Sequence, residues 1–172
     1  MKGLVHIYCG KGKGKTTASV GLSVRAAGAG KRVLFVQFFK NGVSSEVKML
    51  SMLPGVETLV NEKPVNFFLK MDEQQKKEAV EIYEELLKKA LEQSENVDLL
   101  VLDEIISTCN YGIADENRLV DFLENKREEL EVVLTGRGPS EKLLELADYV
   151  TEMTKIKHPY DEGVPARKGI EF

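Results

Sequence analysis

Short apolar runs alternate with amphipathic segments along this chain, and the alternation predicts the order of its elements. Strand-like runs rich in Val, Ile, Leu and Phe occupy residues 4–9, 32–39, 97–102 and 131–134, with weaker candidates at 56–60 and 149–153. Continuous apolar runs of this length are typical of strands that are buried on both faces of a parallel sheet. The sequence therefore predicts a mainly parallel sheet.

Helical periodicity fills the segments between these runs. Helices are predicted over residues 15–29, 46–52, 72–93, 115–126 and 139–147, the last starting at Pro139. The clearest is 72–93, where Asp72 and Gln75 have the spacing of an N-terminal capping box. The apolar side chains of this helix fall on one face, at Ala79, Tyr83, Leu86, Leu87, Ala90 and Leu91. We expect this face to pack on the sheet.

Strands that alternate with helices indicate an α/β fold, in which helices cover both faces of the sheet. No internal repeat, low-complexity tract or linker interrupts the pattern, so residues 1–172 are expected to form a single domain. The tail over residues 154–172 is rich in Lys, Pro and Gly and shows no clear periodicity.

The composition argues against several function classes. A net charge of −4 and an isoelectric point near 5.4 disfavour a nucleic-acid-binding protein, which usually carries a basic patch. No apolar run approaches the roughly 18 residues of a membrane span, and the first strand-like run begins too early for a signal peptide. The two cysteines, Cys9 and Cys109, are too few for a disulfide framework and lack metal-ligand spacing. We expect a cytoplasmic protein without a membrane or nucleic-acid partner.

The turn after the first strand-like run carries the strongest chemical signal. Glycines and lysines alternate there before two threonines: Gly10, Lys11, Gly12, Lys13, Gly14, Lys15, Thr16 and Thr17. In a loop of this kind between a strand and a helix, the backbone N–H groups point toward phosphate oxygens. The partial positive charge of the helix N-terminus adds to the attraction. Lys15 is expected to reach phosphate oxygens, and the Thr16 hydroxyl to ligate Mg²⁺.

This loop is one residue shorter than the general phosphate-loop pattern. The pattern places its first glycine five residues before Gly14, and Cys9 occupies that position. A shorter loop would hold a triphosphate differently from the loop of an ordinary ATPase. The alternative interpretation is a flexible turn with incidental lysines, and it explains the density of Gly, Lys and Thr poorly.

Two acids, Asp103 and Glu104, close the run 97–102. A carboxylate at this place in a phosphate-loop protein lies beside the loop and holds Mg²⁺ directly or through water. An acidic pair at a strand end can also be merely solvated, but the loop upstream favours a metal-binding role. The spacing leaves open which of the two acids touches the metal.

Four segments together narrow the interpretation. They are GKGKGKTTASVGLSVRAAGAGKRVLFVQFFK (10–40), LLVLDEI (99–105), VVLTGRGPSEKLLELADYVTEM (132–153) and KIKHPYDEGVPARKGIEF (155–172). In order and spacing they resemble the ATP:corrinoid adenosyltransferases. The shortened phosphate loop is a trait of that family, and generic ATPases lack the closing segment. The resemblance covers nearly the whole chain and is weakest between residues 41 and 96.

The resemblance implies a RecA-like P-loop fold, often dimeric, and transfer of the 5′-deoxyadenosyl group of ATP to the cobalt of a corrinoid such as cobalamin. Co(I) would attack C5′ and expel triphosphate, so no protein nucleophile is required. Carried over by position, Arg25 and Arg137 help to hold the nucleotide, and Lys15 and Arg137 stabilise the leaving triphosphate. Mg²⁺ is assigned to Thr16 and Glu104, with Asp103 less directly involved. A flavoprotein is the expected electron donor.

The corrinoid side of the resemblance is less complete. Reduction of Co(II) is difficult while an axial ligand is bound, and apolar side chains on the lower face of the corrin would exclude that ligand. Some members place an aromatic pair with a tryptophan before the long helix, whereas this chain has no Trp. Phe67 and Phe68 are the nearest candidates, and packing in the core under a loop is the alternative for both. Longer members also carry an N-terminal extension over the corrin site, a cover that we expect to be missing or supplied otherwise.

Two other functions stay open at this point. A P-loop ATPase or phosphotransferase would cut at the γ-phosphate and release ADP instead of triphosphate. A non-catalytic nucleotide- or corrinoid-binding module would bind ATP without alkylating cobalt. The sequence also leaves open which corrinoid is the substrate, and the expectation of a homodimer rests on the resemblance.

Overall fold

The computed structural model describes residues 2–39, 44–61 and 71–171. Its strands are β1 (Val5–Cys9), β2 (Val33–Gln37), β3 (Val56–Val60), β4 (Leu99–Asp103), β5 (Glu131–Thr135) and β6 (Tyr149–Glu152). They form one sheet in the order β3-β2-β4-β5-β1-β6, in which every neighbouring pair is parallel. The parallel sheet predicted from the apolar runs is confirmed.

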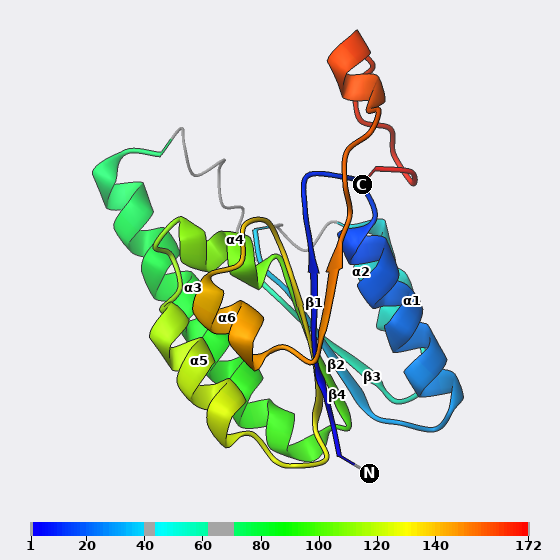
Figure 1. Cartoon of the computed structure of the whole chain (residues 1–172), viewed down its shortest axis with the longest axis vertical. Helices are drawn as coiled ribbons and strands as arrows, with labels where there is room; N and C mark the ends of the chain where they lie inside the picture. Colours follow the sequence, from blue (N-terminus) through cyan, green and yellow to red (C-terminus); the bar gives the residue numbers. More distant parts are fainter. Residues whose placement is uncertain (1, 40–43, 62–70, 172) are drawn as a thin grey trace.

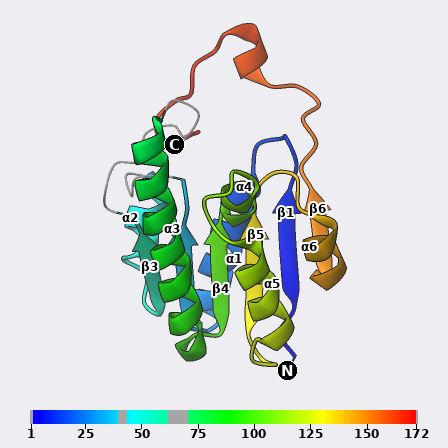
Figure 2. The same ribbon diagram turned by 90° about the vertical axis from the view of Figure 1, so that its left-hand side faces the viewer.

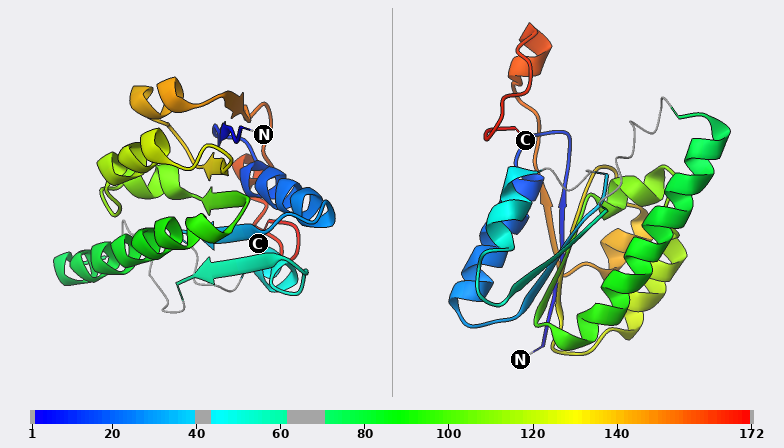
Figure 3. Two further views of the ribbon diagram at one scale, coloured as in Figure 1. Left: turned by 90° about the horizontal axis from the view of Figure 1, so that it is seen from below. Right: turned by 180° about the vertical axis from the view of Figure 1, so that it is seen from behind.

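Helices cover both faces of the sheet, as Figure 1 and Figure 3 show. On one face lie α1 (Lys15–Gly28) and α2 (Ser45–Leu50). On the other lie α3 (Glu73–Gln93), α4 (Ile105–Asn110), α5 (Glu116–Asn125) and α6 (Glu141–Leu146). Short 3-10 turns follow α3 (η2, Ser94–Asn96) and interrupt the C-terminal tail (η3, Pro159–Glu162). None of the helices in the described ranges is both long and apolar enough to cross a bilayer.

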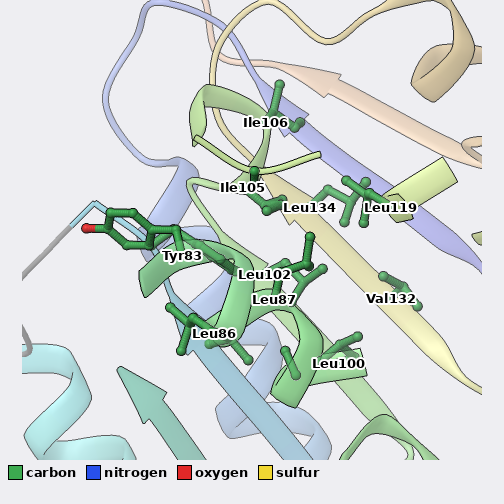
Figure 4. Packing of buried hydrophobic residues seen from close by; sticks show 14 of the residues in the cluster. Tyr83, Leu86, Leu87, Leu100, Leu102, Ile105, Ile106, Leu119, Val132 and Leu134 are labelled. Atoms are coloured by element: carbon green, nitrogen blue, oxygen red, sulfur yellow. The ribbon is translucent and has the colours of Figure 1, made fainter. Parts of the chain in front are cut away.

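The larger hydrophobic core lies between the sheet and α3, where the predicted apolar face packs as expected. Tyr83 and Leu87 are fully buried against Leu100 and Leu102 of β4 (Figure 4). The remaining predicted positions on this face are buried except Leu91, which is partly buried. At about 25 cal/mol per Å² of apolar surface, burial of each such side chain contributes about 1.5–3 kcal/mol to folding. A second core packs α1 and α2 against the opposite face.

The helix α3 begins where its capping box was predicted. The backbone N–H of Gln75 donates to Asp72 Oδ1 at 2.8 Å, and the backbone N–H of Asp72 donates to Gln75 Oε1 at 3.1 Å. These bonds satisfy two backbone donors that would otherwise lack partners at the first turn.

The end of β2, the start of α6 and the presence of α4 differ from the predictions for local reasons. β2 ends at Gln37 instead of residue 39, because Phe39 adopts a positive φ of 60° that turns the chain away from the sheet. α6 begins after Ser140, whose side chain accepts a hydrogen bond from the N–H of Leu143, and not at Pro139. The six-residue α4 was not predicted, since its apolar start continues the run of β4.

The carboxyl ends of parallel strands meet at one edge of the sheet, which is where ligands bind in open α/β sheets. This edge therefore holds the turn after β1, the acids at the end of β4 and the turn after β5, with β5 between β4 and β1. The tail that follows β6 arches over the same edge, as Figure 2 shows. Sites predicted from distant parts of the sequence thus meet here.

Candidate active site

The phosphate loop surrounds the ammonium group of Lys15. Lys15 Nζ donates to the backbone carbonyl oxygens of Gly10 and Gly12, both at 3.0 Å, and the side chain is only 6% exposed. Burial is the main effect on the pKa of this lysine and lowers it, while the Glu104 carboxylate raises it. A polyanion bound here would favour the charged form of Lys15. The loop thus holds one desolvated cation at the N-terminus of α1.

The chain beyond β6 supports this loop through close backbone contact. The N–H of Gly12 donates to the carbonyl oxygen of Met153 at 2.6 Å. A Cβ at residue 12 would lie 2.6 Å from that same oxygen. Glycine is therefore required at this position by the approach of a neighbouring backbone. Met153 follows β6 directly, so the edge strand sets the shape of the loop.

Polar side chains end the three central strands, and they bond to one another. Asp103, at the end of β4, accepts from Thr135 Oγ1 at 2.7 Å on one carboxylate oxygen. The other oxygen accepts from Gln37 Nε2 and from Thr16 Oγ1, both at 3.2 Å. Asp103 is fully buried. Its carboxylate therefore orients the hydroxyl of Thr16 from below the phosphate loop.

Glu104 has a strained backbone that turns its side chain into the cleft. Its φ of 63° lies in the left-handed region, which costs a non-glycine residue about 1–2 kcal/mol. The backbone N–H of Glu104 donates to Thr135 Oγ1 at 2.8 Å, and its carboxylate accepts from Ser107 Oγ at 2.7 Å. Strain of this kind clusters at functional sites. The turn brings Glu104 to the cleft that Lys15 and Thr16 also line.

These groups open into a cleft of about 540 Å³, within the range of about 300–1,000 Å³ that is usual for small-molecule sites. The phosphate loop, α2, Glu104 and the end of the tail form its walls. The lining residues are Lys13, Gly14, Lys15, Thr16, Thr17, Val20, Ser45, Glu46, Met49, Glu104, Gly169, Ile170 and Glu171.

Arg137, Arg25 and Lys11, which were predicted to bind the nucleotide, lie at different positions relative to the cleft. Arg137 is exposed in the turn after β5; its charge contributes to lowering the pKa of Lys15, but its side chain does not line the cleft. Arg25 lies ten residues after Lys15 on α1, about 15 Å along the helix axis, and is exposed. Within this chain the structure does not bring Arg25 to the loop. Lys11 is exposed on the loop and does not line the cleft.

The turn that carries Arg137 depends on Gly136. Gly136 has a φ of 149°, and a Cβ there would lie 2.7 Å from both Ile106 Cβ and the backbone nitrogen of Ser107. The next N–H, of Arg137, donates to Ser107 Oγ at 3.2 Å, which fixes this turn against α4.

Replacement of Gly136 by Ala is expected to lower the free energy of unfolding by about 1–3 kcal/mol and to weaken ATP binding, because the methyl group displaces the Arg137 turn. Thermal unfolding and calorimetric titration with Mg-ATP measure the two effects. Gly21→Ala is the matched control. In the part of the chain that the structure describes, a Cβ at that helical position would meet nothing within 4 Å beyond its own turn of helix, so stability should hold or rise. Equal behaviour of the two variants would contradict the packing argument.

The oxygen ligands at the cleft suit a hard cation such as Mg²⁺. Within the described residues no three His, Cys, Asp or Glu side chains form a group that could hold a metal by themselves. Mg²⁺ usually takes one or two carboxylates and completes its shell with phosphate and water oxygens, as Thr16, Glu104 and a bound triphosphate would allow. Among the described residues Gln37 Oε1, which is buried beside Asp103, has no hydrogen-bond partner, and an ordered water would satisfy it.

The predicted residues Phe67 and Phe68 lie outside the described residues. Several other residues of this site were not predicted from the sequence. Gln37, Thr135 and Ser107 were not predicted, although a polar residue that ends an apolar strand is a signal for the first two. The tail residues that line the cleft belong to the closing segment that carries part of the resemblance, but they were given no role in the site.

Comparison with known proteins favours one of the functions that the sequence left open. A sequence model of the family described as ATP:corrinoid adenosyltransferase BtuR/CobO/CobP matches residues 1–172. The chain belongs to this adenosyltransferase family. The corrinoid adenosyltransferase of Escherichia coli (strain K12) is 32% identical over 171 residues, which cover 99% of this chain and 86% of the relative. That of a Sinorhizobium species is 35% identical over 182 residues, which cover 99% and 81%.

Solved structures confirm the fold expected for the adenosyltransferase family. EssC (ATPases 2 and 3) from Geobacillus thermodenitrificans matches with a TM-score of 0.56 at 16% identity, over 97% of this chain and 35% of that chain. The cytoplasmic domain of the Thermomonospora curvata type VII secretion ATPase EccC matches with a TM-score of 0.54 at 17% identity, over 96% and 22%. This chain corresponds to about a third or less of those proteins. At such identities the likeness concerns the α/β P-loop fold alone.

Proposed function

We propose that this chain transfers the 5′-deoxyadenosyl group of ATP to the Co(I) of a corrinoid and releases triphosphate. The observation that carries the proposal is the cleft in which a buried loop lysine, a loop threonine and a strained glutamate converge, within a chain that matches the family from end to end. The cleft is open and polar at the phosphate loop, as a triphosphate requires.

In this reaction the protein must stabilise negative charge on the leaving group. An electron pair of Co(I) forms the new bond to C5′, and the pair of the broken C5′–O bond leaves with the triphosphate. Negative charge therefore grows on the leaving group, where Lys15 and Arg137 supply positive charge. The protein must also hold C5′ in line with cobalt, which is a matter of position and not of acid or base catalysis.

We propose that Thr16 and Glu104 hold a Mg²⁺ ion together with the triphosphate. Bound there, the ion would neutralise charge on the phosphate oxygens. Asp103 supports this arrangement from behind, because it already binds the Thr16 hydroxyl and is fully buried. Glu104 is the direct ligand in this proposal, since it lines the cleft and Asp103 does not.

We also propose a homodimer, a flavoprotein as electron donor and a cytoplasmic location. The resemblance to the family supports the dimer and the electron donor, and the composition, without an apolar run as long as a membrane span, favours the cytoplasm. The exposed edge strand β6 adds support for the dimer, because Tyr149 and Val150 on it are 52% and 48% exposed. Light scattering after gel filtration measures the number of copies.

An anaerobic assay with Mg-ATP and chemically reduced cob(I)alamin tests the proposed function. The expected result is the spectrum of a light-sensitive alkylcobalt product together with triphosphate. ADP and orthophosphate without alkylcobalt would show a phosphotransferase or ATPase. Binding of ATP without any product would show a binding module.

We expect Phe67 and Phe68 to matter for the reduction of cobalt. If apolar side chains exclude the lower axial ligand, the double replacement by Ala should lower turnover from Co(II) much more than turnover from pre-reduced Co(I). Parallel anaerobic assays with the two substrates measure the ratio. Equal losses would remove both residues from ligand exclusion and leave the packing alternative.

A further inference from the structure

The C-terminal tail returns to the phosphate loop after it crosses the carboxyl edge of the sheet (Figure 2). Glu171 lies 158 residues from Lys13 in the sequence, yet its Oε1 accepts a hydrogen bond from Lys13 Nζ at 3.1 Å. Gly169 and Ile170 line the same cleft as Lys15. The end of the tail is therefore a wall of the nucleotide cleft.

Two cations share the carboxylate of Glu171. Besides Lys13, Arg167 donates to both oxygens: its Nη2 to Oε1 at 3.0 Å, and its Nε and backbone N–H to Oε2 at 3.1 Å and 2.8 Å. These bonds from Arg167 are the main reason why the pKa of Glu171 falls to about 2. Glu171 is thus an anion at any pH at which the enzyme would work.

The donors that hold this carboxylate are those that bind phosphate elsewhere. A lysine at a phosphate loop and the planar fork of an arginine both suit phosphate oxygens as well as they suit carboxylate oxygens. Lys13 is 48% exposed and Arg167 is 60% exposed, so both side chains have room to change partner. The carboxylate and a bound triphosphate would therefore compete for the same cations, Lys13 in the lining of the cleft and Arg167 beside Glu171.

We propose that Glu171 is an internal anion that competes with the triphosphate of ATP for Lys13 and Arg167. Binding of the nucleotide displaces the carboxylate, transfers the two cations to phosphate oxygens and releases the end of the tail from the loop. The end of the tail is then held against the phosphate loop only in the absence of nucleotide. This inference rests on the proposed function in one respect, that the cleft binds a triphosphate.

Calorimetric titration of the full chain with inorganic tripolyphosphate and Mg²⁺ tests the inference. Glu171→Gln keeps the size of the side chain and removes its charge, so tripolyphosphate should bind about twofold to fivefold more tightly, as expected for one partly exposed ion pair. Glu162→Gln is the matched control. It removes the same charge from the same tail, but Glu162 pairs with Lys157 outside the cleft. Its affinity should equal that of the unaltered chain.

The results distinguish failure of the proposed competition by Glu171 from failure of the proposed function. Unchanged or weaker binding by Glu171→Gln would overturn the competition, as would equal tightening by Glu162→Gln, which would show an effect of net charge. Thermal unfolding of each variant establishes that it is folded. Lys15→Ala tests the cleft itself. If the unaltered chain does not bind tripolyphosphate, or binds it as tightly without Lys15, the proposed function fails and the inference fails with it.

Discussion

Lys15→Ala is expected to lower the turnover of Mg-ATP and cob(I)alamin about 10²- to 10³-fold, the usual effect of removing one preorganised group from a developing negative charge. Lys15 is the buried cation of the cleft, and the carbonyl oxygens of Gly10 and Gly12 hold it at the N-terminus of α1. The other two lysines of the loop, Lys11 and Lys13, are exposed and do not reach that depth. The measurement is the rate of alkylcobalt formation under anaerobic conditions.

The loss should occur without loss of the fold. Because burial lowers the pKa of Lys15, the folded protein holds that proton less tightly than the unfolded chain does. The contribution of Lys15 to stability therefore rises with pH between its lowered pKa and its ordinary value of 10.5. At neutral pH the charge is a cost, so Lys15→Ala should unfold at the same temperature or a higher one. Lys89→Ala is the control, because Lys89 is exposed on α3 and should retain full turnover. Full turnover of Lys15→Ala would refute the assignment of the loop.

Local signals in the sequence predicted most of the fold. The capping box of Asp72 and Gln75, the apolar face of α3 and the strand-like runs are patterns within a few residues, and each is present in the structure. The errors arose where two signals overlap. The apolar residues of α4 continue those of β4, and only the positive φ of Glu104 separates the two elements. A sequence pattern does not show such a turn at a non-glycine residue.

The candidate site was predictable as far as its motifs are contiguous. Lys15, Thr16 and Glu104 were predicted and do line one cleft. Their supports were not, because Gln37 and Thr135 join Asp103 only through the order of β2, β4 and β5 in the sheet. That order is a property of the tertiary fold.

Arg25 and Glu171 show that the position of a residue in the fold matters as much as its type. Arg25 was assigned by resemblance, and the structure shows it three turns along α1 from the loop. Glu171 had no assignment, and the structure shows it against Lys13. Motifs give the types of residue that a reaction needs, whereas the path of the tail decides which of them reach the cleft.

The two acids at the end of β4 should respond differently to replacement. Glu104→Gln is expected to lower turnover about 100-fold with little change in stability, because it removes a charge from the proposed Mg²⁺ ligand and keeps the bond to Ser107. Glu104→Gly should lose as much turnover and yet gain up to about 1 kcal/mol of stability, since glycine has no strain at a φ of 63°. Initial rates at several Mg²⁺ concentrations and thermal unfolding measure these effects.

Asp103→Asn should lose stability as well as turnover. The amide would face hydroxyl and amide donors that now bond to a carboxylate, and one buried donor without a partner costs about 1–3 kcal/mol. The Thr16 hydroxyl would lose its orientation at the same time. Glu124→Gln, an exposed change on α5, is the matched control for loss of one carboxylate. If Glu104→Gln retained turnover while Asp103→Asn lost it at full stability, Asp103 would be the metal ligand and the proposed roles would be reversed.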